Sequence, residues 1–108
     1  MSGLTFGASD ARTYISNNTA GNITIVRIYF SWPSINGLLD EIKLDGAKIW
    51  EGLASTPANI TSGWTGSSRT ILPSDTVELK LRYDKSEIET SHSVTVYFSN
   101  GCAAGASN

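Results

Sequence analysis

Two runs of alternating apolar and polar residues give the clearest structural signal in this chain. In residues 77–83 every second residue is apolar and the residues between them are charged, and residues 92–98 repeat the alternation with Ser, Thr and Tyr as the polar partners. A period of two residues is typical of a β-strand with one buried face and one solvated face. Residues 84–90, which join the two runs, have a suitable length for a wide hairpin loop. The pattern therefore predicts two paired β-strands.

The rest of the chain has the pattern of further short strands separated by turn residues. The Asn- and Gly-rich residues 17–22 predict a turn, and Asp45-Gly46 is a residue pair favoured in type I′ hairpin turns. Pro33 ends the longest strand because proline has no backbone N–H for the ladder. The strands predicted in addition to the two alternating runs are 4–6, 13–15, 23–32, 38–44, 47–50 and 69–72.

Two segments carry weaker patterns. Residues 52–68 are rich in Gly, Ser, Thr, Pro and Asn, with Ile60 and Trp64 as the expected inward anchors. Residues 100–108 are small and lack alternation, so we expect a flexible tail there.

This spacing of strands and turns is typical of one all-β fold class. About seven to nine short strands, with turn signals every eight to twelve residues, predict an immunoglobulin-like β-sandwich in which two sheets share one core. We expect a single domain over residues 1–108. A jelly roll or a small open barrel is the alternative architecture. The predicted core consists of Val26, Ile28, Phe30, Ile42, Leu44, Val77, Leu79, Leu81, Val94, Val96 and Phe98.

Charge narrows the class of partner. The net charge is −2, and the eight Lys and Arg residues are scattered without a run. Phosphate backbones and anionic membrane surfaces are bound by clustered cations, so we expect no nucleic-acid partner. The most apolar stretch, residues 23–32, is interrupted by polar residues and is too short for a membrane span, so we expect no membrane insertion.

Composition also bears on location. Only 17% of the residues are charged, and Ser, Thr and Asn supply much of the polar surface. This balance is common in bacterial extracellular and surface modules, so we expect an extracellular or cell-surface location. Residues 1–6 lack the basic and apolar regions of a signal peptide, so we expect the leader of a secreted parent protein to be absent from this chain.

Residues able to perform catalysis or hold a metal are few. The chain has one His and one Cys; His92 is expected on the apolar face of a strand and Cys102 in the tail, so we expect neither a nucleophile–base pair nor a zinc site. Residues 84–89 hold three carboxylates that suggest calcium, but Lys85 opposes the required charge density and favours a solvated loop. We expect no catalytic residue, no cofactor and no bound metal.

Aromatic residues are the best candidates for a binding surface. Tyr29 and Tyr97 fall on the outward faces of their strands, and on neighbouring strands the two rings would form a platform for a sugar ring. The alternative is a structural role, in which outward Tyr residues pack across strands and the Trp residues fill the core or its edges. The candidate ligand or interface aromatics are Tyr29, Trp50, Trp64 and Tyr97.

Several stretches resemble immunoglobulin-like β-sandwich modules of bacterial secreted and cell-surface proteins, some of them pilus-associated or adhesive. The resemblance extends from Asn17 to Cys102 and is carried by residues 28–33, 36–37, 39–46, 49–52 and 94–102. It implies an extracellular structural or adhesive module. In such modules a cysteine near the first strand is expected to pair with the one in the terminal Asn-Gly-Cys, and this chain has Met1-Ser2-Gly3 at that place. The partner then lies outside this sequence, or Cys102 is free or forms an intermolecular disulfide.

Two classes of function remain open. The first is a non-enzymatic structural or adhesive module, whose partners are other protein subunits, surface proteins or further copies joined through open strand edges. The second is a carbohydrate-binding module that uses exposed Trp and Tyr. A flat row of exposed rings would favour sugar binding, and buried rings would favour a scaffold.

Overall fold

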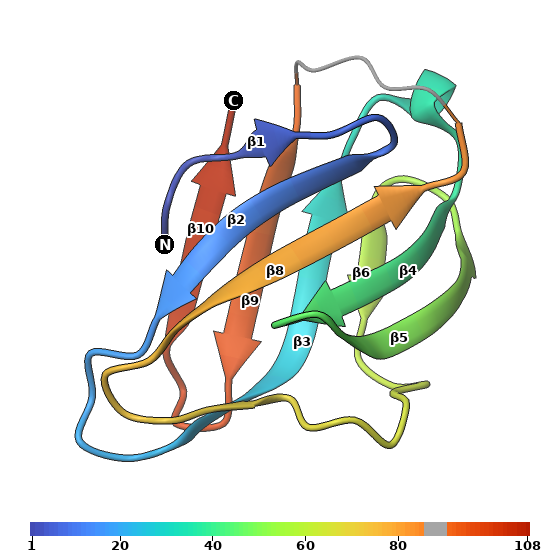
Figure 1. The fold of residues 1–108 in the computed structure, drawn as a ribbon. Helices are drawn as coiled ribbons and strands as arrows, with labels where there is room; N and C mark the ends of the chain where they lie inside the picture. The colour runs from blue at the N-terminus through green and yellow to red at the C-terminus, as the bar shows by residue number, and fades with distance from the viewer. Residues whose placement is uncertain (86–90) are drawn as a thin grey trace.

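Two antiparallel five-stranded sheets pack face to face in the computed structural model of this protein, which describes residues 1–85 and 91–108 (Figure 1). The all-β sandwich predicted from strand spacing is confirmed. Its strands form two separate sheets, and a 3-10 turn lies at Ser34–Asn36. No helix in the described residues is long and apolar enough to cross a membrane.

The first sheet, which we call the β8 sheet, has the strand order β1-β2-β8-β4-β5. Its strands are β1 (Thr5–Phe6), β2 (Asp10–Ser16), β8 (Thr76–Tyr83), β4 (Leu39–Leu44) and β5 (Ala47–Ala54). Asp45 and Gly46 join β4 to β5, and their φ angles of 53° and 82° confirm the predicted type I′ turn, which requires positive φ at both central residues.

The second sheet, which we call the β3 sheet, has the order β10-β9-β3-β6, with β7 paired to the beginning of β3. Its strands are β10 (Ala103–Ser107), β9 (Ser93–Phe98), β3 (Ile23–Ser31), β6 (Ala58–Ile60) and β7 (Thr70–Ile71). The structure describes ten strands, more than the seven to nine predicted. The additional strands are short segments such as β6, which pairs with β3 although its residues show no clear apolar/polar alternation.

The core lies between the inner faces of the two sheets. Nine residues of the predicted core are buried and Val77 is half-buried against them; the nine are Ile28, Phe30, Ile42, Leu44, Leu79, Leu81, Val94, Val96 and Phe98. Tyr83, at the end of the alternating strand β8, is also buried. Further buried residues come from strands whose alternation is short or broken: Ile15, Ile23, Ile25, Leu39, Ile49, Ala58, Ile60 and Ile71.

The prediction for Val26 is wrong, because its side chain is 42% exposed. Ile25 pairs with Phe98 and Arg27 pairs with Tyr97, so Val26 is the extra residue of a β-bulge. A bulge changes which side of the strand the following residues face. Ile25 therefore points into the core on one side of the bulge and Ile28 on the other.

The prediction of a flexible tail over residues 100–108 is also wrong in part, because residues 103–107 form strand β10. β10 pairs with β9 along its whole length, from Ala103 opposite Tyr97 to Ser107 opposite Ser93. Gly101, at φ 87°, reverses the chain between the two strands. Residues 103–107 form a strand although they are small, because their backbone groups form hydrogen bonds with the edge of β9 that β3 leaves unpaired.

The segment 52–68 is more regular than its composition indicates. β5 continues to Ala54, and β6 follows. Ile60 is buried and Trp64 is half-buried against the core, so both serve as the expected anchors.

The prediction that residues 77–83 and 92–98 pair as a hairpin is wrong, because β8 belongs to one sheet and β9 to the other. Both strands alternate because each has one face in the core, and the pattern along a strand does not specify its neighbour. Of the predicted loop 84–90, residues 86–90 lie outside the described residues.

Candidate functional site

The outer faces of the two sheets differ sharply in charge. The strands of the β8 sheet carry Asp10, Arg12, Asp40, Glu41, Lys43, Lys48, Glu51, Glu78, Lys80 and Arg82. In the described strands of the β3 sheet, Arg27 is the only charged residue. Any partner therefore meets a charged surface on one side of the sandwich and a nearly neutral one on the other.

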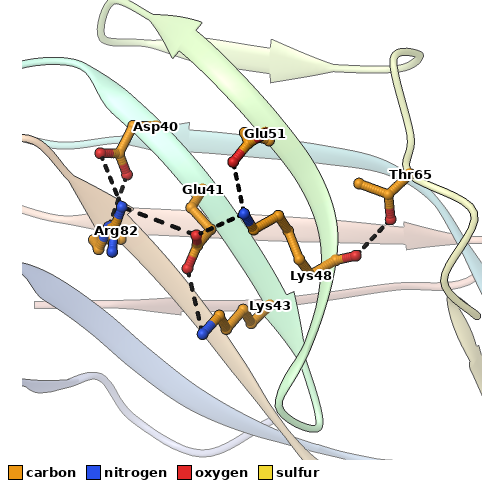
Figure 2. Close-up of polar contacts among 7 residues, drawn as sticks. All are labelled: Asp40, Glu41, Lys43, Lys48, Glu51, Thr65 and Arg82. Atoms are coloured by element: carbon orange, nitrogen blue, oxygen red, sulfur yellow. Dashed lines mark hydrogen bonds and ion pairs between the residues drawn. The ribbon is translucent and has the colours of Figure 1, made fainter.

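A network centred on Glu41 organises the charged face (Figure 2). Lys48 Nζ lies 3.4 Å from Glu41 Oε2 and 2.6 Å from Glu51 Oε2. Lys43 Nζ lies 3.6 Å from Glu41 Oε1, and Arg82 Nη2 lies 3.9 Å from Glu41 Oε2. The network therefore ties together β4, β5 and β8.

Glu41 is the buried member of this network, with 8% of its side chain exposed. Burial by itself raises its pKa, but the hydrogen bond from Lys48 and the charges of Arg82, Lys43 and Lys48 together lower that pKa below its ordinary value of 4.5. Glu41 is therefore ionised at neutral pH. Each of the three cations already contacts a carboxylate, which fits a role in holding the sheet together.

The neutral face presents Tyr29 and Tyr97 on neighbouring strands, as the platform hypothesis requires. The ladder between β3 and β9 places Arg27 opposite Tyr97 and Tyr29 opposite Thr95. On the far side of β9, Ala103 lies opposite Tyr97. Both tyrosines are half-buried, so neither ring stands free of the surface.

Arg27 covers one side of the Tyr97 ring. Its Cζ lies 4.6 Å from the ring centroid, and its Nε donates a hydrogen bond of 2.6 Å to Asn59 Oδ1 on β6. A cation held over an aromatic face is attracted by the negative potential of the ring. Arg27, which is the only cation in the described strands of this sheet, therefore links Tyr97 on β9 and Asn59 on β6 from its own strand β3.

The two candidate tryptophans, Trp50 and Trp64, pack against the core and pair with each other. Trp50 on β5 is part of the buried core at 8% exposure, and it forms an isolated bridge with Trp64. Trp64 is half-buried, with the Cζ of Arg69 4.6 Å from its ring centroid. Arg69 Nη1 also donates a hydrogen bond of 2.7 Å to the carbonyl of Ile25. Both indole rings are engaged in packing, which favours the scaffold over the sugar platform.

Two glycines lie against the ring of Trp50 in the folded chain. A Cβ atom added at Gly52 would lie 2.9 Å from the Trp50 ring, and one added at Gly63 would lie 3.5 Å from its Nε1. The ring is therefore bounded by backbone that carries no side chain. These contacts depend on the tertiary structure, so the positions of the two glycines in the sequence do not by themselves predict that Trp50 is buried.

His92 and Cys102 are not brought together. His92 is 1% exposed, and its ring lies 4.8 Å from that of Phe6, centroid to centroid. Cys102 is an exposed free cysteine next to the β9–β10 turn, whereas His92 lies beside Asn108 at the other end of the hairpin. The hairpin therefore separates the two side chains by most of its length.

The described residues contain no group of three or more His, Cys, Asp and Glu side chains placed to hold a metal ion. The calcium hypothesis for residues 84–89 falls mostly outside the described residues.

Comparisons with known proteins give this chain no relative: no family model, no curated protein and no solved structure matches it. The features of the chain that bear on its function are therefore the two outer faces and the strand edges.

Proposed function

We propose that this chain is a non-enzymatic structural or adhesive module that works outside the cell and contacts other protein subunits or surface proteins. The observation that carries the proposal is the nearly neutral outer face of the β3 sheet, on which Tyr29, Tyr97 and Arg27 lie together. Protein interfaces are depleted in charge at their centres and enriched in Tyr and Arg. The opposite face, with its paired charges, suits contact with water.

The arrangement of the remaining candidate residues supports a scaffold. Trp50 and Trp64 stabilise the sandwich, and His92 packs between the two sheets. A general base must reach the group that it activates. The His92 ring is enclosed by aromatic side chains, and Cys102 lies at the other end of the hairpin.

The proposal is tested by adhesion of beads that display many copies of the chain, since multivalent display makes weak contacts measurable. The beads are washed over surfaces coated with collagen, fibrinogen or mucin. We expect retention on at least one of the coatings, and at least a tenfold loss of that retention in the variant Arg27→Ser/Tyr29→Ser/Tyr97→Ser.

The matched control is Tyr14→Ser, which removes an exposed tyrosine from the charged β8 sheet. Circular dichroism checks that all variants keep the β-sandwich. Absence of retention on every coating, or an equal loss in the Tyr14→Ser control, would contradict the proposal.

Carbohydrate binding is the second candidate, and the outward position of Tyr29 and Tyr97 on neighbouring strands favours it. Stacking on a sugar needs one open ring face, and Arg27 already lies over one face of Tyr97. Binding to an array of bacterial and host glycans tests this candidate. Hits that vanish in both Tyr29→Ala and Tyr97→Ala would favour a sugar platform, and an empty array would leave the protein-binding module.

A further inference from the structure

The two sheets have four edges, and three of them are protected. β1 has two residues and β6 has three, so each offers little backbone for pairing. β5 carries Lys48 and Glu51, and Trp64 and Thr65 cover its edge: the N–H of Thr65 donates a hydrogen bond of 2.9 Å to the carbonyl of Ile49. Short length, charge and a covering segment are devices that prevent edge-to-edge association.

The fourth edge, strand β10, carries none of these devices over residues 103–107. It has five residues, contains neither a charged residue nor a proline, and pairs with β9 without a register shift. In the described part of the chain no other strand pairs with its outer side. A regular, uncharged and uncovered edge strand is a template for another strand.

The backbone groups that face this open edge follow from the hydrogen bonds to β9. The N–H of Phe98 donates to the carbonyl of Cys102 at 2.9 Å, and the N–H of Asn108 donates to the carbonyl of His92 at 3.0 Å. Hydrogen-bonded residues alternate along an antiparallel strand. The N–H and C=O groups of residues 103, 105 and 107 therefore point away from β9, toward solvent.

The sequence of β10 suits pairing with itself. Ala-Ala-Gly-Ala-Ser reads almost the same from either end, with Gly105 at its centre. In an antiparallel pair about Gly105, Ala103 faces Ser107 of the other copy, and Ala104 faces the other Ala106. Ala104 and Ala106 are half-buried against the core, so a second β10 would extend the apolar inner face of the sheet.

We infer that β10 is an interface at which a second copy of this chain adds its own β10, antiparallel and related by a two-fold axis through Gly105. The pair exchanges about six backbone hydrogen bonds, two for each of the three facing residue pairs. The absence of charged residues in β10 supports a second copy as the partner, because two neutral β10 strands meet without like-charge repulsion. Since β10 is the one open edge among the described strands, pairing closes as a dimer and forms no filament. The inference rests on the proposed structural role and names one partner for it.

The test is sedimentation equilibrium of the whole chain with reductant, over protein concentrations up to about 1 mM. We expect the mass to rise from one chain to two and to go no further. The variant Ala103→Glu/Ser107→Glu places carboxylates opposite each other at both ends of the paired strands and should remain a single chain. The control Thr61→Glu/Ser62→Glu adds the same charge on exposed residues after β6 and should still dimerise.

A charge-swapped mixture makes the test specific for register. Ala103→Lys/Ser107→Lys alone should also stay a single chain, but mixed with Ala103→Glu/Ser107→Glu it should form a one-to-one dimer. Should a charged variant fail to fold by circular dichroism, Ala103→Pro removes one edge-facing N–H without adding charge and should weaken the dimer at least tenfold.

A single chain at every concentration, dimerisation that survives the paired glutamates, or a mixture that stays unpaired would overturn the inference. None of these results touches the proposed function, because bead adhesion depends on the face that carries Tyr29 and Tyr97. Adhesion without dimers would remove only the β10 interface, and dimers without adhesion would remove only the adhesive face.

Discussion

The hydroxyl oxygen of Tyr83 lies 3.3 Å from Nε2 of His92, in a buried contact that links the two sheets. Tyr83 is the last residue of β8, and His92 immediately precedes β9. The His92 ring also packs edge-on against Phe6 and tilts toward Phe30. The single histidine of the chain is therefore a structural residue that joins both sheets at one end of the core.

Replacement of His92 should be costly for stability. His92→Ala leaves a cavity beside Phe6 and Phe30 and is expected to lower the free energy of unfolding by about 3 kcal/mol. Tyr83→Phe keeps the ring, loses the hydroxyl contact and should cost about 1 kcal/mol. Urea denaturation measures both.

The control for Tyr83→Phe is Tyr14→Phe, which removes an exposed hydroxyl 3.4 Å from Glu78 and should change the free energy of unfolding by less than about 0.5 kcal/mol. A loss in the control equal to that of Tyr83→Phe would contradict the role assigned to the buried contact.

The Glu41 network predicts a dependence of stability on pH. Because the pKa of Glu41 is lower in the folded protein than its ordinary 4.5, folding favours the carboxylate. The stabilisation is complete above the unfolded-state pKa and is lost as the pH falls through the folded-state pKa. Glu41→Gln should therefore lower the free energy of unfolding by about 1 kcal/mol at pH 7, and the difference from the unchanged protein should shrink at acid pH.

Glu51→Gln is the matched control for this pH dependence. The Glu51 side chain is 63% exposed and contacts Lys48 at the surface, so its loss should cost less than about 0.5 kcal/mol. Urea denaturation of both variants between pH 3 and pH 7 makes the comparison. A Glu41→Gln difference that grows toward acid pH would rule out the assigned direction of the pKa shift.

The bulge at Val26 predicts opposite outcomes for two adjacent residues. Val26→Thr changes an exposed β-branched residue into another and should alter the free energy of unfolding by no more than about 0.5 kcal/mol. Ile25→Thr places a hydroxyl in the core and removes buried carbon, at an expected cost of about 3 kcal/mol. Thermal unfolding of the two variants compares them directly. Strong destabilisation by Val26→Thr would show that Val26 faces the core.

The turn between β4 and β5 predicts a purely conformational penalty. Gly46 has a φ of 82° and open space around the position of a Cβ atom. Gly46→Ala should thus lower the free energy of unfolding by about 1 to 2 kcal/mol through backbone strain without a clash. Gly66→Ala, also in open space but without positive φ, should have almost no effect. Equal effects of the two substitutions in urea denaturation would refute the assigned turn.

Cys102 predicts a covalent dimer that is independent of the β10 interface. Its thiol is exposed, and treatment with diamide as oxidant should give a disulfide-linked dimer on a non-reducing gel, absent in Cys102→Ser. In a dimer paired about Gly105 the two thiols would lie about 20 Å apart. Oxidation should therefore proceed equally well in Ala103→Pro, which weakens the β10 pair without placing a charge beside the thiol. A disulfide that forms only when β10 pairs would disagree with the proposed register.

Local patterns were sufficient for the features that depend on neighbouring residues. The alternation in residues 77–83 and 92–98 predicted β8 and β9, one inner strand of each sheet, and most of their buried residues, because the two faces of a strand repeat every second residue. Asp45-Gly46 gave its turn because few residue types accept positive φ in succession. The apolar face assigned to His92 also followed from this period.

Long-range pairing decided the rest. Val26 lies outside the core because β9 pairs with β3 around a bulge, and β10 forms because the edge of β9 is open to Ala103–Ser107. Alternation along one strand carries no information about the strand beside it. For the same reason the burial of Trp50, the cover of Arg27 over Tyr97 and the single unprotected edge appear only when strands distant in the chain are placed side by side.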